Sequence, residues 1–215
     1  DGYACVRQAR SDQAEKGANW DPTDLFIDED GLINVLDSDM GRIHVYDREL
    51  HYLSTLSFTE EGAEAFLMGI SGLYVDGKGD DKTYYVADPE RERVFIADAK
   101  GAIVREVLRP DTELIDQSVT FAPTKVQLDK NGNLYVLVPG IYMGACMFSA
   151  KDDFAFLTFI GSNPVEATAF LLADYFWKQV LNQNQIDSMK RYVPVSFENF
   201  TLDAEGYLYT VTNKT

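Results

Sequence analysis

The sequence predicts an all-β fold assembled from repeated antiparallel hairpins. Leu128–Val138 places two apolar runs on either side of Asn131-Gly132, which is a strong hairpin signal because both turn residues tolerate positive φ. The same pattern returns at Phe26–Asp37, Tyr74–Asp88 and Thr201–Thr212. The aspartates that end the first apolar run lie 48 and 53 residues apart, at Asp28, Asp76 and Asp129. Periods of this length with four strands each are typical of β-propeller blades rather than of a β-sandwich.

Each repeat contains four strand-like runs joined by short polar turns. The first repeat is predicted to form strands at Asp24–Asp28, Gly31–Asp37, Arg42–Asp47 and Tyr52–Phe58. The second repeat is predicted to form strands at Ile70–Asp76, Thr83–Asp88, Arg93–Asp98 and Ile103–Leu108. The third repeat is predicted to form strands at Thr124–Asp129, Asn133–Val138, Gly144–Phe148 and Phe154–Ile160.

A fourth repeat begins at Phe197 and reaches only its second strand before Thr215. Residues 1–215 are therefore expected to form a single, partial propeller domain of about three and a half blades. Because a propeller must close to pair its edges, we expect it to be part of a longer, six-bladed propeller. The chain begins with Asp rather than Met, so we expect it to be processed or cut.

A helical hairpin is predicted over residues 162–194, as an insertion between the third and fourth blades. Asn163, Pro164 and Glu166 form the cap, the first position and the capping box of a helix. One apolar stripe follows at Val165, Ala169, Leu172, Phe176 and Val180. A second stripe follows at Phe170, Ala173, Trp177 and Leu181. Either a second helix and the propeller rim cover both stripes, or Phe170 and Trp177 contact a partner protein or a missing part of this protein.

Composition limits the classes of partner. Lys and Arg number 19 against 35 Asp and Glu, a formal charge of −16, so neither nucleic acid nor an anionic membrane is expected to bind. No apolar run is long enough for a transmembrane segment. Cys5 and Cys146 are either two unrelated small apolar side chains or a disulfide.

The repeats resemble those of the NHL-repeat family of β-propellers. The sequence pattern of an NHL repeat is closely matched by Pro22–Asp37 followed by Arg42–Asp47. Its middle strands are matched by Thr83–Asp98, and its first two strands by Pro123–Val138. The resemblance covers nearly all of the chain except the insertion. The insertion is similar to one in bacterial NHL proteins that act outside the cytoplasm, which implies an extracytoplasmic or secreted location, with a cytoplasmic one left open. NHL propellers include binding proteins and enzymes, so the resemblance specifies the fold more than the function.

The first functional hypothesis is a non-catalytic binding scaffold for a protein or small-molecule ligand, with no cofactor. Propellers bind ligands where the loops between second and third strands meet the start of the first strands. The candidate ligand-binding residues at this face are Asp24, Asp37, Asp39, Arg42, Asp88, Arg91, Lys125, Tyr142 and Asn199. The alternative for these residues is structural, since Asp in turns commonly bonds to local backbone.

The second hypothesis is a metal-dependent lactonase or other hydrolase, by analogy with six-bladed gluconolactonase-type propellers. A divalent cation such as calcium would need oxygen ligands from several blades, and Asp24, Glu198 and Asn199 are the candidates. Lys125 argues against such a site, because it places a cation near the same axis. His44 and His51 lie in one hairpin, and no Ser-His-Asp or Cys-His set is visible.

Overall fold

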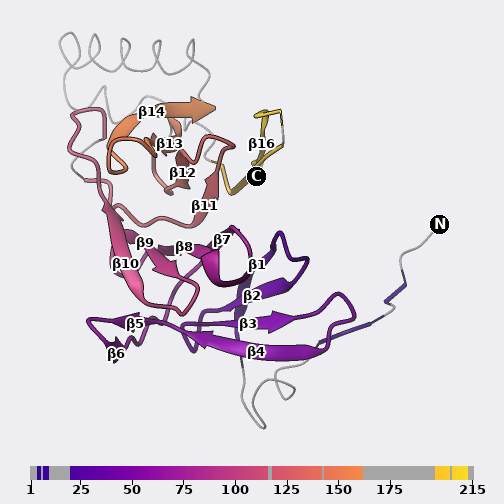
Figure 1. The fold of residues 1–215 in the computed structure, drawn as a ribbon. Helices are drawn as coiled ribbons and strands as arrows, with labels where there is room; N and C mark the ends of the chain where they lie inside the picture. Colours follow the sequence, from indigo (N-terminus) through magenta and orange to yellow (C-terminus); the bar gives the residue numbers. More distant parts are fainter. Residues whose placement is uncertain are drawn as a thin grey trace, which may run out of the picture.

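The structure is a computed structural model that describes residues 4–5, 7–9, 20–115, 118–141, 143–161, 197–203 and 205–212. Within these residues it is nearly all β, and the strands form three four-stranded antiparallel sheets in chain order, followed by a two-stranded sheet (Figure 1). The prediction of an all-β protein built from four-stranded blades is confirmed.

The strands follow the predicted order in every sheet. Blade one contains β1 (Pro22–Ile27), β2 (Ile33–Asp37), β3 (Arg42–Tyr46) and β4 (Tyr52–Ser57). Blade two contains β7 (Gly72–Asp76), β8 (Thr83–Asp88), β9 (Arg93–Asp98) and β10 (Ile103–Leu108). Blade three contains β11 (Lys125–Leu128), β12 (Leu134–Leu137), β13 (Gly144–Phe148) and β14 (Phe156–Gly161). Blade four, as described, contains β15 (Asn199–Leu202) and β16 (Leu208–Val211).

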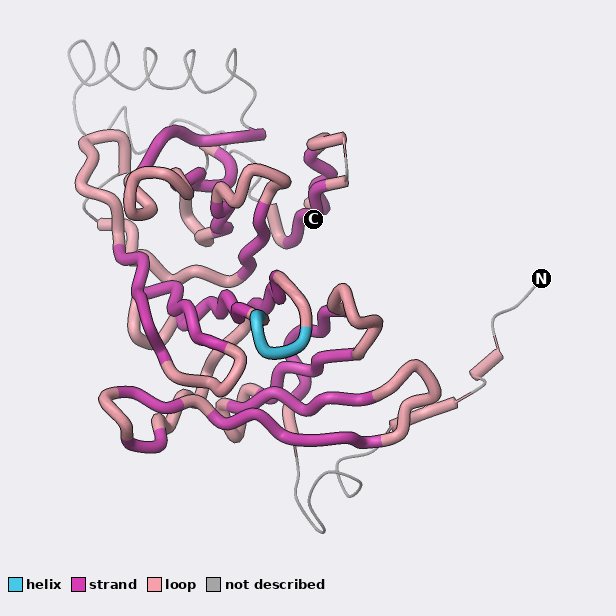
Figure 2. Tube along the Cα trace, viewed as in Figure 1, coloured by secondary structure: helices cyan, strands magenta, loops and turns pink. Residues whose placement is uncertain are grey.

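Two short elements were not predicted. A small hairpin of β5 (Thr59–Glu60) and β6 (Ala63–Glu64) lies between blades one and two, and a 3-10 turn, η1 (Gly79–Asp81), lies in the loop before β8 (Figure 2). Two-residue strands carry no measurable alternation of apolar and polar side chains, so sequence periodicity cannot detect them.

The blades are arranged around their first strands. β1 contacts β7, β7 contacts β11, and β11 contacts β15, so the innermost strands lie side by side. The core lies between consecutive blades. Phe58 of the connection after blade one packs with Val75 and Phe95 of blade two, and a second cluster joins blades two and three. Tyr135 and Leu137 of blade three pack against Phe200 of blade four.

An Asp-centred loop closes the first hairpin of blades one, three and four. In blade three, Asp129 Oδ1 accepts hydrogen bonds from Asn131 N at 2.7 Å and from Asn133 N at 3.0 Å. Gly132 has a φ of 79°, a conformation that side-chain-bearing residues rarely adopt. Asp28 and Asp203 accept the equivalent pairs of backbone hydrogen bonds. The Asp and Gly that repeat in the sequence are therefore the residues that close these loops.

The predicted helical insertion at 162–194, with Phe170 and Trp177, lies outside the described residues, as does Tyr142. Cys5 is exposed and Cys146 is buried, and neither forms a disulfide. Burial raises the pKa of the Cys146 thiol to about 12. Over the described part of the chain, no helix has the length and apolarity to cross a membrane.

Candidate functional site

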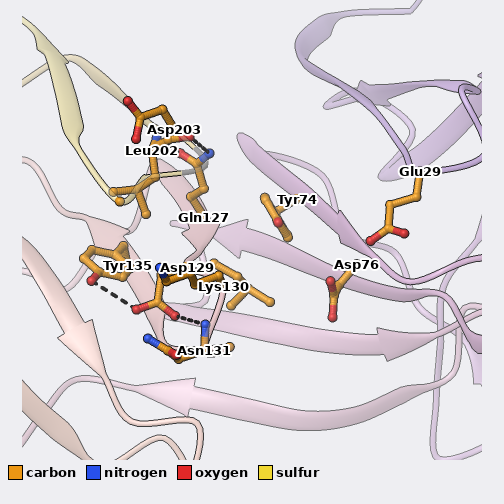
Figure 3. Close-up of a pocket in the computed structure, with 13 residues that line it drawn as sticks. Glu29, Tyr74, Asp76, Gln127, Asp129, Lys130, Asn131, Tyr135, Leu202 and Asp203 are labelled. Atoms are coloured by element: carbon orange, nitrogen blue, oxygen red, sulfur yellow. Dashed lines mark hydrogen bonds between the residues drawn. The ribbon is translucent and has the colours of Figure 1, made fainter.

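A pocket of about 530 Å³ opens at the end of the blades where first strands turn into second strands. It lies between strand ends and loops that come from the four described blades (Figure 3). The polar and aromatic side chains that line it include Glu29, Tyr74, Asp76, Gln127, Asp129, Lys130, Asn131, Tyr135 and Asp203. The four carboxylates exceed the one lysine, so the lining is acidic.

Asp129 is held in the pocket wall as an ionised carboxylate. Its Oδ2 accepts hydrogen bonds from Asn133 Nδ2 at 2.9 Å and from the Tyr135 hydroxyl at 3.4 Å, in addition to the backbone bonds to Oδ1. Burial raises the pKa of Asp129, but the hydrogen bonds from Asn133, Asn131 and Tyr135 outweigh it and hold the pKa below its ordinary value. Asp129 therefore contributes a fixed negative charge, while its oxygens are already engaged by its own loop.

We expect Asp129 to contribute acid-sensitive stability. A carboxylate with a lowered pKa in the folded state stabilises the fold above its ordinary pKa of 3.8, and loses that contribution as the pH falls below this value. Asp129→Ala should therefore lower the thermal midpoint at pH 7, and its difference from wild type should narrow below about pH 4. Circular dichroism melts over this range provide the measurement. Asp76→Ala is the matched control, and a constant difference for Asp129→Ala at all pH values would contradict the assignment.

Asp203 repeats this arrangement on the far wall. Its Oδ2 accepts a hydrogen bond from the Tyr209 hydroxyl at 3.0 Å, and its Oδ1 accepts from Glu205 N and Tyr207 N. Desolvation raises the pKa of Asp203, but the hydrogen bonds from Tyr207, Tyr209 and Glu205 have the larger combined effect, so the pKa lies below its ordinary value. Like Asp129, it supplies charge rather than open acceptor positions.

Tyr74 and Asp76 supply the side chains that remain open to a ligand. The Tyr74 ring packs against Phe26 at 4.6 Å and Tyr85 at 6.3 Å between centroids, which fixes its orientation. Burial, together with Asp76, Glu29 and Asp129, raises the pKa of the Tyr74 hydroxyl, which stays protonated at neutral pH. Within the described residues, neither this hydroxyl nor the exposed Asp76 carboxylate has a hydrogen-bond partner.

Glu29 lies at the edge of the same pocket. Its Oε2 is 3.5 Å from Lys78 Nζ, and both side chains are largely exposed. An exposed pair at this distance is weak and exchanges with solvent, so the Glu29 carboxylate is available to a bound molecule.

Asp24 and Asn199, two of the three residues proposed for a divalent cation, are engaged in other contacts. Asp24 accepts a hydrogen bond from Leu73 N at 2.9 Å and pairs with Lys125 Nζ at 2.9 Å, so it connects blades one, two and three. Asn199 Oδ1 accepts from Phe200 N at 2.8 Å. Among the described residues, no group of three or more His, Cys, Asp or Glu side chains could hold a metal ion.

The predicted residues at the β2–β3 and β8–β9 loops form buried and half-buried polar contacts. Asp37 is fully buried and accepts from Asp21 N and Asp39 N, while its Oδ2 lies 3.2 Å from His44 Nε2. Asp39 itself is exposed. Arg42 pairs with Glu64 of the small hairpin at 3.2 Å. These hydrogen bonds to nearby backbone and to His44 are what is expected if Asp37 has a structural role rather than a ligand-binding one.

Asp88 is also fully buried, and two arginines surround it. Arg91 Nη1 is 3.2 Å from its Oδ1, and Arg93 Nε is 3.1 Å from its Oδ2. Arg93 also pairs with Glu60 and Glu106, so the cluster joins the small hairpin to blade two. Burial lowers the pKa of Arg93, but these carboxylates reverse that effect and raise it, so the guanidinium is charged.

A hydrogen-bonded chain that sequence reasoning missed crosses blade one. His44 Nδ1 lies 2.9 Å from Thr55 Oγ1, which lies 2.8 Å from the Tyr52 hydroxyl, and His44 Nε2 bonds to Asp37. The Trp20 ring packs edge-on against His44 at 5.4 Å. Because its members belong to β2, β3 and β4, this chain ties the strands of one sheet together, and it lies apart from the residues that line the pocket.

Of the predicted ligand-binding residues that the structure describes, which are all except Tyr142, none lines the pocket. Sequence reasoning placed the binding face at the loops between second and third strands, whereas the pocket is at the opposite ends of the same strands. A signal for it was present. Every loop Asp ends a first strand, and since first strands lie side by side, their loops must converge at one end.

The fold defines the class of the protein: four-stranded antiparallel sheets arranged in chain order around their first strands are the blades of a β-propeller.

No protein-family model and no curated protein matches the sequence. A solved structure of a catalytically inactive virginiamycin B lyase from Staphylococcus aureus, with quinupristin, is similar with a TM-score of 0.54 and 11% identity, over 96% of this chain and 52% of the lyase. The extracellular domain of a proposed one-component system from B. thetaiotaomicron is similar with a TM-score of 0.50 and 12% identity, over 88% of this chain and 21% of that one.

The chain thus spans about half the length of the lyase and about a fifth of the length of the second protein. At these identities the similarity shows the β-propeller fold and does not extend to activity.

Proposed function

We propose that this chain is the ligand-binding part of an extracytoplasmic NHL-type β-propeller without catalytic activity. The observation that carries the proposal is the pocket between strand ends and loops of the four described blades, which combines an oriented tyrosine with carboxylates that have no strong partner. Its volume of about 530 Å³ falls in the usual range for small-molecule sites.

The NHL assignment is supported by the match of Pro22–Asp47, which the structure folds into β1, β2 and β3 of blade one. Location outside the cytoplasm is supported by the resemblance of the insertion to those of extracytoplasmic NHL proteins. A structural neighbour is also an extracellular domain.

The pocket lining favours a small polar ligand rich in hydrogen-bond donors, such as a sugar or an amino sugar. Glu29 and Asp76 accept hydrogen bonds, and the Tyr74 hydroxyl both donates and accepts. The fixed charges of Asp129 and Asp203 disfavour anionic ligands, since they would meet a negative lining.

We expect a thermal-shift screen to find a stabilising ligand among neutral sugars and amino sugars. A ligand at a hundredfold excess over its dissociation constant stabilises the folded state by about 2.7 kcal/mol. Asp76→Asn and Tyr74→Phe, which keep the shape of the pocket, should each weaken binding by about tenfold, the effect of one lost polar contact. Isothermal titration calorimetry measures the dissociation constants of the two variants and of the wild type.

Asp39→Asn, an exposed change on the opposite face, is the matched control and should leave binding unchanged. Binding lost in Asp39→Asn and retained in Asp76→Asn would move the site to the β2–β3 loop face. A stabilisation by calcium, zinc or manganese that a chelator reverses would instead support the lactonase-type hypothesis.

A further inference from the structure

One position of each first strand lies two residues before the loop Asp, near the pocket end of the blade. Its four occupants are Phe26, Tyr74, Gln127 and Thr201. The Phe26 and Tyr74 rings pack at 4.6 Å between centroids, and Gln127 Nε2 lies 3.3 Å from Thr201 Oγ1. Tyr74 and Gln127 both line the pocket, so the pocket lies where the aromatic pair of blades one and two meets the polar pair of blades three and four.

Gln127 is held by the main chain of blade four. Its Oε1 accepts a hydrogen bond from Leu202 N at 2.9 Å, which orients the amide (Figure 3). Its Nε2 donates over longer distances, 3.3 Å to Thr201 Oγ1 and 3.5 Å to Leu202 O. These N–H groups are weakly engaged, because ordinary N–H···O distances are about 2.9–3.0 Å. An oxygen of a ligand in the pocket can therefore accept from Gln127 while the bond to Leu202 N keeps the amide in place.

This amide differs in kind from the carboxylates around it. Ionised carboxylates only accept hydrogen bonds, so those of the lining bind an ammonium group as readily as a hydroxyl. Gln127 donates, and an ammonium group has no lone pair that could accept its N–H. Lys130 and Asn131 also carry donors in the lining, but both are exposed, whereas Gln127 is half-buried and oriented by another blade.

We propose that Gln127 is a specificity-determining residue of the pocket, which selects a hydroxyl rather than an ammonium group at its position. The inference rests on the proposed function, since it concerns the ligand of the same site. It narrows the ligand class to a neutral sugar or another polyol. A hydroxyl can donate to Asp76 or Glu29 and can accept from Gln127, because it is both a donor and an acceptor. An ammonium group is favoured by the carboxylates and disfavoured by the amide, and specificity is the difference between the two affinities.

Isothermal titration calorimetry with D-glucose and D-glucosamine tests the assignment. Gln127→Glu keeps an oxygen that accepts from Leu202 N and replaces the amide donor by a carboxylate. It should weaken the binding of D-glucose by about tenfold and should not weaken that of D-glucosamine, so the ratio of the two dissociation constants shifts about tenfold toward the amino sugar. Gln127→Met is similar in length and has no polar group. It should weaken the binding of both sugars, because the contact with Leu202 N is lost as well.

Ser71→Ala is the matched control. Ser71 Oγ also donates across a blade boundary, to Thr124 O at 3.3 Å, but at the start of the first strands and away from the pocket. This variant should leave the binding of both sugars unchanged, and circular dichroism melts check that all three variants fold.

Three outcomes would overturn the inference, and they separate it from the proposed function. An unchanged ratio in Gln127→Glu would give Gln127 a structural role alone. Binding that Asp76→Asn weakens and neither Gln127 variant changes would remove Gln127 from the site and leave the proposed pocket in place. A wild type that binds neither sugar would overturn the inference together with the sugar class of the proposed function.

Discussion

Replacement of Lys82 by Met is expected to destabilise the fold by about 3 kcal/mol, because it leaves a buried carboxylate without its cation. Lys82 Nζ lies 2.7 Å from Asp28 Oδ2 and 3.0 Å from Asp30 Oδ2, and its side chain is only 8% exposed. Burial disfavours both charges. The contacts with Asp28 and Asp30 nevertheless raise the pKa of Lys82, while Lys82, Asn34 and Leu32 lower that of Asp28.

The expected loss lies at the lower end of the range for one-sided removal of a buried ion pair, about 3–5 kcal/mol. Asp28 retains hydrogen bonds from Asn34 Nδ2, Leu32 N and Asp30 N, at 2.9, 2.9 and 3.1 Å. What Asp28 loses is the only cation paired with it among the described residues. The substitution also removes one of the contacts between the first loop of blade one and the segment before β8, while the hydrogen bond from Gly79 N to Asp30 remains.

Urea unfolding, followed by circular dichroism, measures this difference. Lys78→Met is the matched control, because Lys78 is 63% exposed and its pair with Glu29 is 3.5 Å long. It should change the free energy of unfolding by less than about 0.5 kcal/mol. Equal effects of the two substitutions would show that the Lys82 pair is no stronger than a surface pair.

Phe58→Ala is expected to destabilise the fold by about 3–5 kcal/mol, the usual cost of removing a buried aromatic ring and leaving a cavity. Phe58 is fully buried, and its ring meets Phe95 edge-on at 4.9 Å between centroids. It belongs to the cluster between blades one and two, where Ile70 and Val86 are also fully buried. Neighbouring strands cannot collapse into the cavity without disturbing their hydrogen-bonded registers.

The same denaturation experiment supplies the measurement, and the chain offers a matched phenylalanine. Phe66 is 78% exposed, so Phe66→Ala should change stability by no more than about 0.5 kcal/mol. A small effect of Phe58→Ala would mean that blades one and two are not held together by this cluster.

Local chemistry explains why the blades were predictable. The Asp and Gly of each first hairpin act within a few residues of one another, so their spacing in the sequence carries the loop geometry directly. All twelve strands predicted for blades one to three are present, with ends within two residues of the predicted ones. The β5–β6 hairpin lacked such a signal, because its strands are two residues long and are held by distant arginines.

The candidate site was less predictable, because its geometry depends on contacts between blades. Lys125 pairs with Asp24 at 2.9 Å, a contact between two repeats that no local sequence pattern indicates. The burial of Asp88 depends on Arg93, whose other partners, Glu60 and Glu106, are far apart in the sequence. The pocket requires Tyr74, Asp129 and Asp203 to converge from three repeats, and repeat spacing alone does not say at which end of the strands a pocket forms.

The order of strands in each sheet also bears on how the chain folds. Every hydrogen-bonded neighbour in the three full blades is the next strand along the chain, so contact order within a blade is low. Sequence-distant contacts are concentrated between blades, such as the one between Gln127 Oε1 and Leu202 N. Since closing short loops costs little chain entropy, most of the entropic barrier to folding falls on docking one blade against another.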